Sequence, residues 1–270
     1  MRIARFRLPG EEPEFGIVEL ESDSGQYPET VAVISNDPLV GPVKYTGARY
    51  SLEAVRLLAP VIPRSKIIAF ARNWREHAFE MGTVAPSVPM AFMKPNTSVI
   101  GPDEAIVKPH ECERLHYEGE LAVVIGRICR RVSVEQAEKV IFGYTCANDV
   151  TARDLQDTDE QWARAKGFDT FCPLGPWMVA HLTVAEADNL RIVTRVDDEV
   201  VQDGTTADMV HSIAEMVAFA SGFATLLPGD VLLTGTPPGI GPLEPGQRVS
   251  VAIEGVGVLE NPVVAEGSDG

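Results

Sequence analysis

The apolar run at residues 121–125 (LAVVI) constrains the fold of this chain most strongly. It is short, rich in β-branched residues and closed by Gly126, which predicts a buried strand. Glu118 and Glu120 stand at its start, and side chains two residues apart on a strand project from the same face. Adjacent carboxylates repel each other and are costly to bury unpaired. The pattern therefore predicts a cation between them, and a hard divalent metal ion suits oxygen ligands of this kind.

A third carboxylate, Asp149, comes after a second apolar stretch at residues 140–147. If both stretches are strands of one sheet, all three acidic side chains can occupy one face of an oxygen-ligand site. Three carboxylates, with water or substrate completing an octahedron, suit magnesium or manganese better than zinc. The alternative is that Glu118 and Glu120 lie on a solvated strand face and bind no ion.

His77 and Glu80 lie three residues apart on a predicted helix that ends at Gly82, so they share one helix face. The carboxylate can orient the imidazole for proton transfer, or the two can form an ordinary surface pair. The second histidine of a zinc metalloprotease helix is missing, which argues against zinc. Lys166 is either a solvated lysine or a cation placed near developing enolate charge. The turn at residues 234–239 (TGTPPG) either only reverses the chain or offers N–H and hydroxyl groups to an anionic substrate.

The order of predicted elements indicates an α+β protein. Residues 1–59 alternate short apolar stretches with Gly-, Pro- and Asp-rich turns, and Pro60 and Pro63 mark a boundary. Beyond it, strands outnumber helices and do not alternate regularly with them, which favours a mixed β-roll or barrel. Ser133 and Gln136 predict a capped helix through Val140. We further expect a helical stripe at residues 209–220, a loop at residues 166–176, and hairpins at residues 191–202 and 248–264.

Charge and cysteine spacing exclude several functions. The formal net charge of −16 makes nucleic acid and anionic membranes poor partners. The four cysteines form no C-x-x-C pair, which fits free, mostly buried thiols in a reducing compartment. No apolar run approaches 18 residues and no secretory signal pattern begins the sequence, so we expect a cytoplasmic protein.

Taken together, these residues resemble the fumarylacetoacetate hydrolase superfamily. The resemblance covers roughly residues 63–263 and keeps the family order of motifs. One departure is Ala71-Arg72-Asn73-Trp74 where the family usually has Gly-Arg-Asn-Tyr, and we expect it to reshape the pocket entrance. The matching stretches are residues 72–80 (RNWREHAFE), 92–95 (FMKP), 118–121 (EGEL), 148–156 (NDVTARDLQ), 164–176 (RAKGFDTFCPLGP) and 233–237 (LTGTP).

The resemblance implies a mixed β-roll, barrel-like catalytic domain, which we assign to residues 61–270, and a homodimer. The turn-rich pattern before it predicts a small β-rich N-terminal domain over residues 1–60. It implies Mg²⁺ or Mn²⁺ on the three carboxylates, with Lys166 beside the metal. It places the His77–Glu80 dyad on a lid helix. It also makes Arg72, Gln156 and Thr236 substrate-binding residues.

The expected substrate is a small 2-oxo or β-diketo acid that binds the metal through its carboxylate and C2 carbonyl oxygens. The metal and Lys166 would stabilise the enolate formed when a C–C bond breaks, in acylpyruvate-type hydrolysis or oxaloacetate-type decarboxylation. One alternative is a 2-hydroxyhepta-2,4-diene-1,7-dioate isomerase of aromatic catabolism. Another is a non-catalytic metal- or ligand-binding β protein, which would have no need of His77, Glu80 and Lys166 together.

Overall fold

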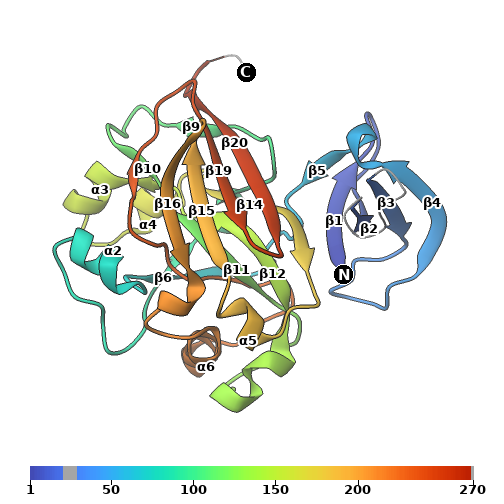
Figure 1. Ribbon diagram of the computed structural model, residues 1–270, viewed down its shortest axis with the longest axis horizontal. Helices are drawn as coiled ribbons and strands as arrows, with labels where there is room; N and C mark the ends of the chain where they lie inside the picture. Colours follow the sequence, from blue (N-terminus) through green and yellow to red (C-terminus); the bar gives the residue numbers. More distant parts are fainter. Residues whose placement is uncertain (21–28, 269–270) are drawn as a thin grey trace.

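The N-terminal lobe is a small antiparallel β structure. In the computed structural model, which describes residues 1–20 and 29–268, it appears on one side of the molecule (Figure 1). Its elements are β1 (Arg2–Arg7), β2 (Glu14–Glu19), β3 (Thr30–Ile34), β4 (Tyr45–Ser51), the 3₁₀ helix η1 (Leu52–Ala54) and β5 (Arg56–Leu58). This confirms the expected β-rich N-terminal region.

The main body is mostly sheet with a few short helices, which confirms the predicted α+β class. Its first half contains β6 (Ile67–Ala71), α2 (Arg75–Glu80), β7 (Met90–Lys94), η2 (Asn96–Ser98), β8 (Val99–Ile100), β9 (Ile106–Lys108), β10 (Leu115–Tyr117), β11 (Gly119–Ile125), η3 (Val134–Val140), β12 (Ile141–Asn148), β13 (Thr151–Ala152), α3 (Arg153–Thr158) and α4 (Ala163–Gly167). Its second half contains β14 (Cys172–Val179), α5 (Val184–Ala187), β15 (Arg191–Val196), β16 (Glu199–Thr205), η4 (Thr206–Asp208), α6 (Ile213–Phe223), β17 (Val231–Leu233), β18 (Gly241–Pro242), β19 (Arg248–Ile253) and β20 (Gly257–Ala265).

One large mixed sheet runs through both parts in the order β4-β3-β2-β1-β14-β12-β11-β17-β6-β7. A five-stranded sheet, β16-β15-β19-β20-β9, packs against it, and a short sheet, β13-β10-β18, lies near the site. No sheet closes into a barrel within the described residues. The pairing of β1 with β14 carries the large sheet across the predicted domain boundary, and separate folding of residues 1–60 stays a prediction.

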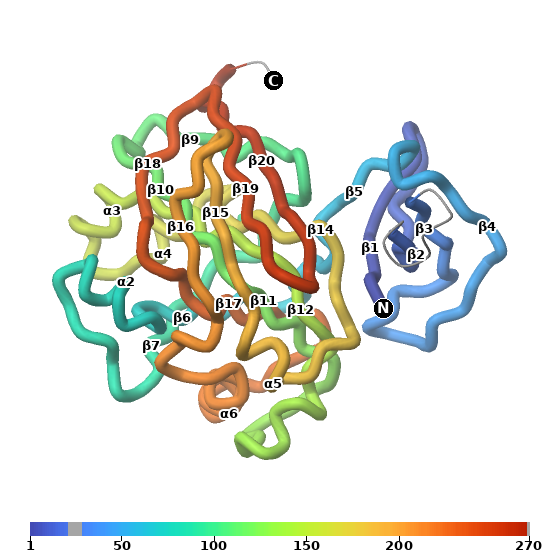
Figure 2. The backbone as a smooth tube through the Cα atoms, viewed as in Figure 1, coloured from blue at the N-terminus to red at the C-terminus, as the bar shows by residue number. Residues whose placement is uncertain are grey.

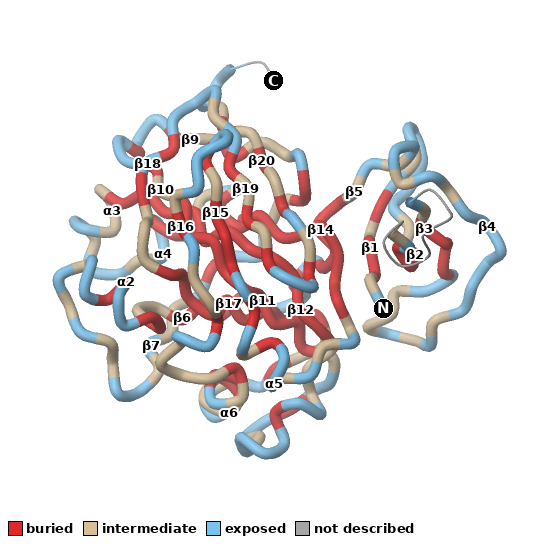
Figure 3. Tube along the Cα trace, in the orientation of Figure 1, coloured by how far each residue is buried: buried red, intermediate tan, exposed pale blue. Residues whose placement is uncertain are grey.

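The strand β11 lies at the centre of this arrangement, as its apolar run predicts. Every residue of it is buried (Figure 3). Leu121 and Val123 belong to the core cluster that includes Val251 of β19, whereas Ala122 and Val124 belong to the cluster on the other face of the large sheet. Each fully buried Leu or Val side chain stabilises the fold by about 1.5–3 kcal/mol. Burial on both sides therefore fixes which β11 residues face each core cluster, and with it the register of β11 against β12.

The prediction of a loop at residues 166–176 is wrong. Lys166 belongs to α4, and Cys172 begins the wholly buried strand β14. Gly and Pro suggested a loop, but prolines are tolerated in strands where a backbone donor is not needed. Pro173 lies in the two-residue pairing with β8, and Pro176 lies where the register with β12 shifts.

The helix predicted through Val140 is present as the 3₁₀ helix η3, but its predicted capping box at Ser133 is wrong, because Ser133 makes no side-chain cap hydrogen bond. The Gln136 N–H donates to the Ser133 carbonyl oxygen (3.0 Å), so Ser133 Oγ has no cap donor there. Capping boxes occur instead before α6 (Ser212 with Glu215) and before α5. The predicted stripe is real from Ile213 onward, but Met209 precedes the helix. Both predicted hairpins are confirmed as β15–β16 and β19–β20.

Two further expectations concern the whole chain. The four cysteines are free and buried, and burial raises the pKa of Cys146 and of Cys172 to about 12. None of the described helices is long and apolar enough to span a membrane. Figure 2 shows that α2, α3 and α4 gather on the side of the body away from the N-terminal lobe. The candidate site lies among these helices.

Candidate active site

The three predicted carboxylates converge in one place, which we call the carboxylate floor (Glu118, Glu120 and Asp149). One ligand oxygen from each lies within 4.8 Å of the others, and all three residues are buried. The register of β11 with β12 explains this, because Gly119 pairs with Asn148. The Asp149 N–H also donates to the Glu118 carbonyl oxygen (2.8 Å). The solvated strand face is thereby excluded.

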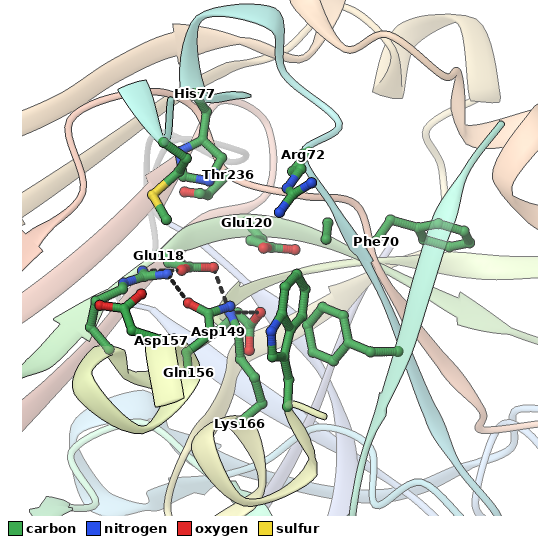
Figure 4. Close-up of a pocket in the computed structure, with 15 residues that line it drawn as sticks. Phe70, Arg72, His77, Glu118, Glu120, Asp149, Gln156, Asp157, Lys166 and Thr236 are labelled. Atoms are coloured by element: carbon green, nitrogen blue, oxygen red, sulfur yellow. Dashed lines mark hydrogen bonds and ion pairs between the residues drawn. The ribbon is translucent and has the colours of Figure 1, made fainter. Parts of the chain in front are cut away.

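Three cations surround the floor. Lys166 Nζ lies 2.8 Å from Glu118 Oε2 and 2.6 Å from Asp149 Oδ2. Arg153 pairs with Glu118 Oε1, and Lys94 Nζ lies 2.6 Å from Asp149 Oδ1. Figure 4 shows Lys166 beside Glu118 and Asp149. Of these three cations, only Lys166 was predicted from the sequence to act at the site. Lys94 ends the apolar strand β7, and nothing in the local pattern indicates that its partner is Asp149.

The floor carries uneven charge. Burial by itself would raise the pKa of Glu118, but Lys166 and Arg153 outweigh it and hold that pKa below its ordinary value. Burial raises the pKa of Glu120 well above its ordinary value, and repulsion by Asp149 and Glu118 adds to this effect. Burial would lower the pKa of Lys166, yet Asp149 and Glu118 raise it overall. Glu120 is therefore the carboxylate that the protein's own cations leave least compensated.

The donor set fits a hard divalent ion. Glu120 Oε2 accepts from the Gly235 N–H (2.7 Å), while its Oε1 accepts no hydrogen bond from any residue that the structure describes. Buried carboxylate oxygens that meet at one point are the ligands that Mg²⁺ and Mn²⁺ prefer. Glu118, Glu120 and Asp149 would hold such an ion, and its charge would compensate Glu120.

The opposite side of the cavity, which we call the α2 wall, carries Arg72, His77 and Glu80. His77 lines the cavity and is buried, and its Nδ1 lies 3.2 Å from Glu80 Oε2. Glu80 lies behind the imidazole and accepts from the Gly239 N–H (3.1 Å). The helix ends as predicted, because Gly82 adopts a left-handed φ of +68°. His77 thus faces the carboxylate floor across the cavity, with Glu80 paired to its Nδ1 (Figure 4 shows His77 and the carboxylates).

The three predicted substrate-binding residues all line the cavity. Arg72 has a left-handed φ of +57°, which costs a non-glycine residue about 1–2 kcal/mol. Gln156 accepts from Arg153, so its amide NH₂ stays available. Thr236 donates its hydroxyl to the Gly119 carbonyl oxygen (2.8 Å). The N–H groups of Gly235 and Gly239 are engaged by Glu120 and Glu80, so in this structure the 234–239 turn serves protein carboxylates.

The cavity has a volume of about 230 Å³, which suits a small metabolite. Phe92 and Trp162 form an edge-to-face pair with centroids 5.6 Å apart, and Lys166 Nζ lies 5.2 Å from the Phe92 ring centre. Seven further residues line the cavity, and of these only Ala71 was expected at the pocket. They are Phe70, Ala71, Met81, Phe92, Arg153, Asp157 and Trp162.

The departure at residues 71–74, which we expected to reshape the pocket entrance, reaches the cavity at Ala71 but not at Trp74. Trp74 is buried in the core beside Gly204 and Gly235 and is not among the residues that line this cavity. Residue 74 precedes α2 and pairs with Met209 in an isolated bridge. Of the two departures in that stretch, only Ala71 contacts the cavity.

Two family models together match nearly the whole chain. Residues 66–264 match the model described as fumarylacetoacetate (FAA) hydrolase C-terminal. Residues 1–60 match the model described as Rv2993c-like, N-terminal.

Named relatives carry several activities. Oxaloacetate tautomerase YisK of Bacillus subtilis is 43% identical over 226 residues, 79% of this chain and 75% of that protein. A solved 5-carboxymethyl-2-hydroxymuconate delta-isomerase from Mycobacterium smegmatis is 44% identical, with a TM-score of 0.89 over 98% of this chain and 100% of that one. A maleylpyruvate hydrolase from Sphingobium sp. SYK-6, solved with manganese (II) ion and pyruvate, is 30% identical, with a TM-score of 0.79 over 98% of this chain and 99% of that one.

Proposed function

The chain belongs to the fumarylacetoacetate hydrolase family, and on that premise we propose that it is a divalent-metal-dependent enzyme that forms the enolate of a small 2-oxo acid. The observation that carries the proposal is the buried carboxylate floor, open to a small cavity with an imidazole on the opposite wall. Relatives that act as tautomerase, isomerase and hydrolase share the need to stabilise charge beside a carbonyl.

A divalent ion held by Glu118, Glu120 and Asp149 would supply Lewis-acid stabilisation of negative charge on the C2 oxygen. The chain's own part begins with Lys166, whose ammonium lies between Glu118 and Asp149 and would add a second positive charge beside that oxygen. The enclosed position of Lys166 strengthens this effect, because charges interact more strongly where water is excluded.

Proton transfer to carbon falls to the His77–Glu80 dyad. Glu80 accepts from Nδ1–H and so fixes the tautomer, which leaves Nε2 as the nitrogen available to the substrate. In tautomerisation His77 Nε2 first takes a proton from solvent and then delivers it to C3, while the enol hydroxyl releases its proton to solvent, so the imidazole ends as it began. The reaction therefore balances without a further reactant.

We place keto–enol tautomerisation of an oxaloacetate-like acid first, because it requires only the enolate stabilisation and proton transfer that the floor and the dyad would supply, and a relative named for it is 43% identical. C–C bond cleavage is the second candidate, supported by the hydrolase solved with manganese and pyruvate. In that case the dyad would activate a water for attack on the distal carbonyl. Isomerisation of an unsaturated diacid differs only in which carbon receives the proton.

The test is a substrate panel with Mg²⁺ and Mn²⁺. Oxaloacetate, acylpyruvates and dienoic diacids are followed by enol absorbance and by product mass. Tautomerase activity changes the absorbance without loss of carbon, whereas hydrolase or decarboxylase activity yields smaller acids. A non-catalytic binder would leave every member of the panel unchanged with either metal, and that result would refute the proposal.

A further inference from the structure

Arg72 is a cation in the cavity with no protein partner. It lines the cavity, and among the described residues its guanidinium makes no hydrogen bond or ion pair. In Figure 4 it enters the cavity on the opposite side of the carboxylates from Lys166. A guanidinium carries five donors in a fixed fork that matches a carboxylate. Arg72 is thus free to bind an anionic group of a ligand.

The charges on the floor already balance without Arg72. Its three carboxylates face Lys94, Arg153 and Lys166, and Asp157, which also lines the cavity, pairs with Arg114 (2.6 Å). A divalent ion would add two further positive charges. At the reacting end of a substrate, one carboxylate and one enolate oxygen carry two negative charges, which offset the two positive charges of the ion. The positive charge of Arg72 is then available to a further anion.

The backbone around Arg72 is held in place independently of any ligand. The next residue, Asn73, donates its amide to the carbonyl oxygens of Thr234 (2.9 Å) and His211 (3.1 Å). Its Oδ1 accepts from the His211 N–H (2.9 Å). These bonds hold the left-handed turn at residue 72 and fix where its side chain starts. Because the backbone that carries this guanidinium is held in place, the side chain is preorganised for binding.

We propose that Arg72 binds a second carboxylate at the far end of the substrate and so selects 2-oxo dicarboxylic acids over 2-oxo monocarboxylic acids. This rests on the proposed function, since the reacting end must lie on the carboxylate floor. Arg72 is then a specificity-determining residue, and the chemistry stays with Lys166 and His77.

The experiment measures binding with two inert probes that differ only in the distal charge. N-oxalylglycine has a 2-oxo acid end and a distal carboxylate, and its glycine methyl ester keeps the first and neutralises the second. Calorimetry with the Mg²⁺-loaded protein gives Kd for both probes in wild type, Arg72→Gln, Arg72→Lys and Arg75→Gln. Arg75 is an exposed arginine that does not line the cavity, so it serves as the matched control.

Wild type and Arg75→Gln should bind the diacid roughly 10- to 100-fold more tightly than the ester, the range for a charge-assisted hydrogen-bonded pair. Arg72→Gln should abolish that preference and leave ester affinity within about threefold, and Arg72→Lys should restore part of it. Equal affinity of wild type for both probes, or equal weakening of both in Arg72→Gln, would overturn the inference while leaving the proposed function standing. Failure of either probe to bind any variant, with Mg²⁺ present, would overturn both.

Discussion

The carboxylate floor and the α2 wall face each other across one cavity but are built differently. Each floor residue is almost fully buried, and two of the three carboxylates have both oxygens paired with cations. On the wall, the Glu80 side chain is 33% exposed, Arg72 has no partner among the described residues, and the neighbouring Phe79 is 83% exposed. The floor is fixed by the sheet before any ligand arrives. The wall depends on a short helix and a few local bonds.

This contrast separates two kinds of effect. Changes to Glu118 or Asp149 should cost metal affinity and folding stability together, because they break buried ion pairs. Changes on the wall should cost turnover or selectivity and leave both the metal and the fold intact. Each substitution below tests that separation.

The largest effect is expected for Glu118→Ala. It removes a ligand and leaves Lys166 and Arg153 short of a buried partner, so we expect activity to fall at least about 1000-fold. Unfolding free energy should fall by about 3–5 kcal/mol, the usual cost of breaking a buried pair. Calorimetric metal titration and chemical denaturation measure both losses. Metal affinity equal to that of the exposed control Glu113→Ala would rule out the site.

On the wall, His77→Ala should retain the metal and lose about 100- to 10,000-fold in kcat, the range for general acid–base catalysis. Titration with Mn²⁺ followed by steady-state kinetics separates the two quantities. The control is His110→Ala, which changes an exposed histidine remote from the cavity lining. Activity at the wild-type rate in His77→Ala would remove the assigned role, and lost metal binding would break the separation of floor from wall.

Lys94→Met tests whether the floor needs support from outside the cavity. Lys94 is buried and not among the lining residues, yet its Nζ holds Asp149 Oδ1. Loss of a partner that orients a ligand typically weakens metal binding about 10- to 100-fold. We expect that weakening, with kcat little changed at saturating metal. An unchanged Kd for Mg²⁺ would show that Lys166 alone is enough to orient Asp149.

The smallest effect is expected for Glu120→Gln in the metal-free protein, and its sign is opposite. The pKa of Glu120 is higher in the folded state than in the unfolded state. Below the unfolded-state pKa this carboxyl is protonated in both states and does not change the free energy of unfolding. As pH rises from there towards the folded-state pKa, ionisation favours the unfolded state, so the free energy of unfolding falls. The amide keeps an acceptor for Gly235 N–H, so the variant should be more stable by about 1 kcal/mol or more at neutral pH. Thermal unfolding from pH 4 to pH 8 should show the difference growing with pH. A variant less stable than wild type at neutral pH would contradict this reading of the floor.

The sequence predicted the floor better than the rest of the site. The apolar run at residues 121–125 predicts a buried strand, and strand alternation places Glu118 and Glu120 on one face. Asp149 follows from the end of the next strand. The supporting cations Lys94 and Arg153 depend on pairings between segments distant in the chain, which local patterns do not encode. The loop predicted at residues 166–176 failed for a related reason, because tertiary burial of β14 overrode its Gly- and Pro-rich composition.

The central claim, metal-dependent enolate chemistry on the carboxylate floor, is tested most directly by following the enol absorbance of oxaloacetate as it ketonises. The traces compare wild-type protein with Mg²⁺, the same protein after chelation, Glu118→Ala with Mg²⁺, and Mg²⁺ alone. Our account predicts acceleration in the first sample and the background rate in the other three. Equal acceleration by the chelated protein or by Glu118→Ala would contradict it.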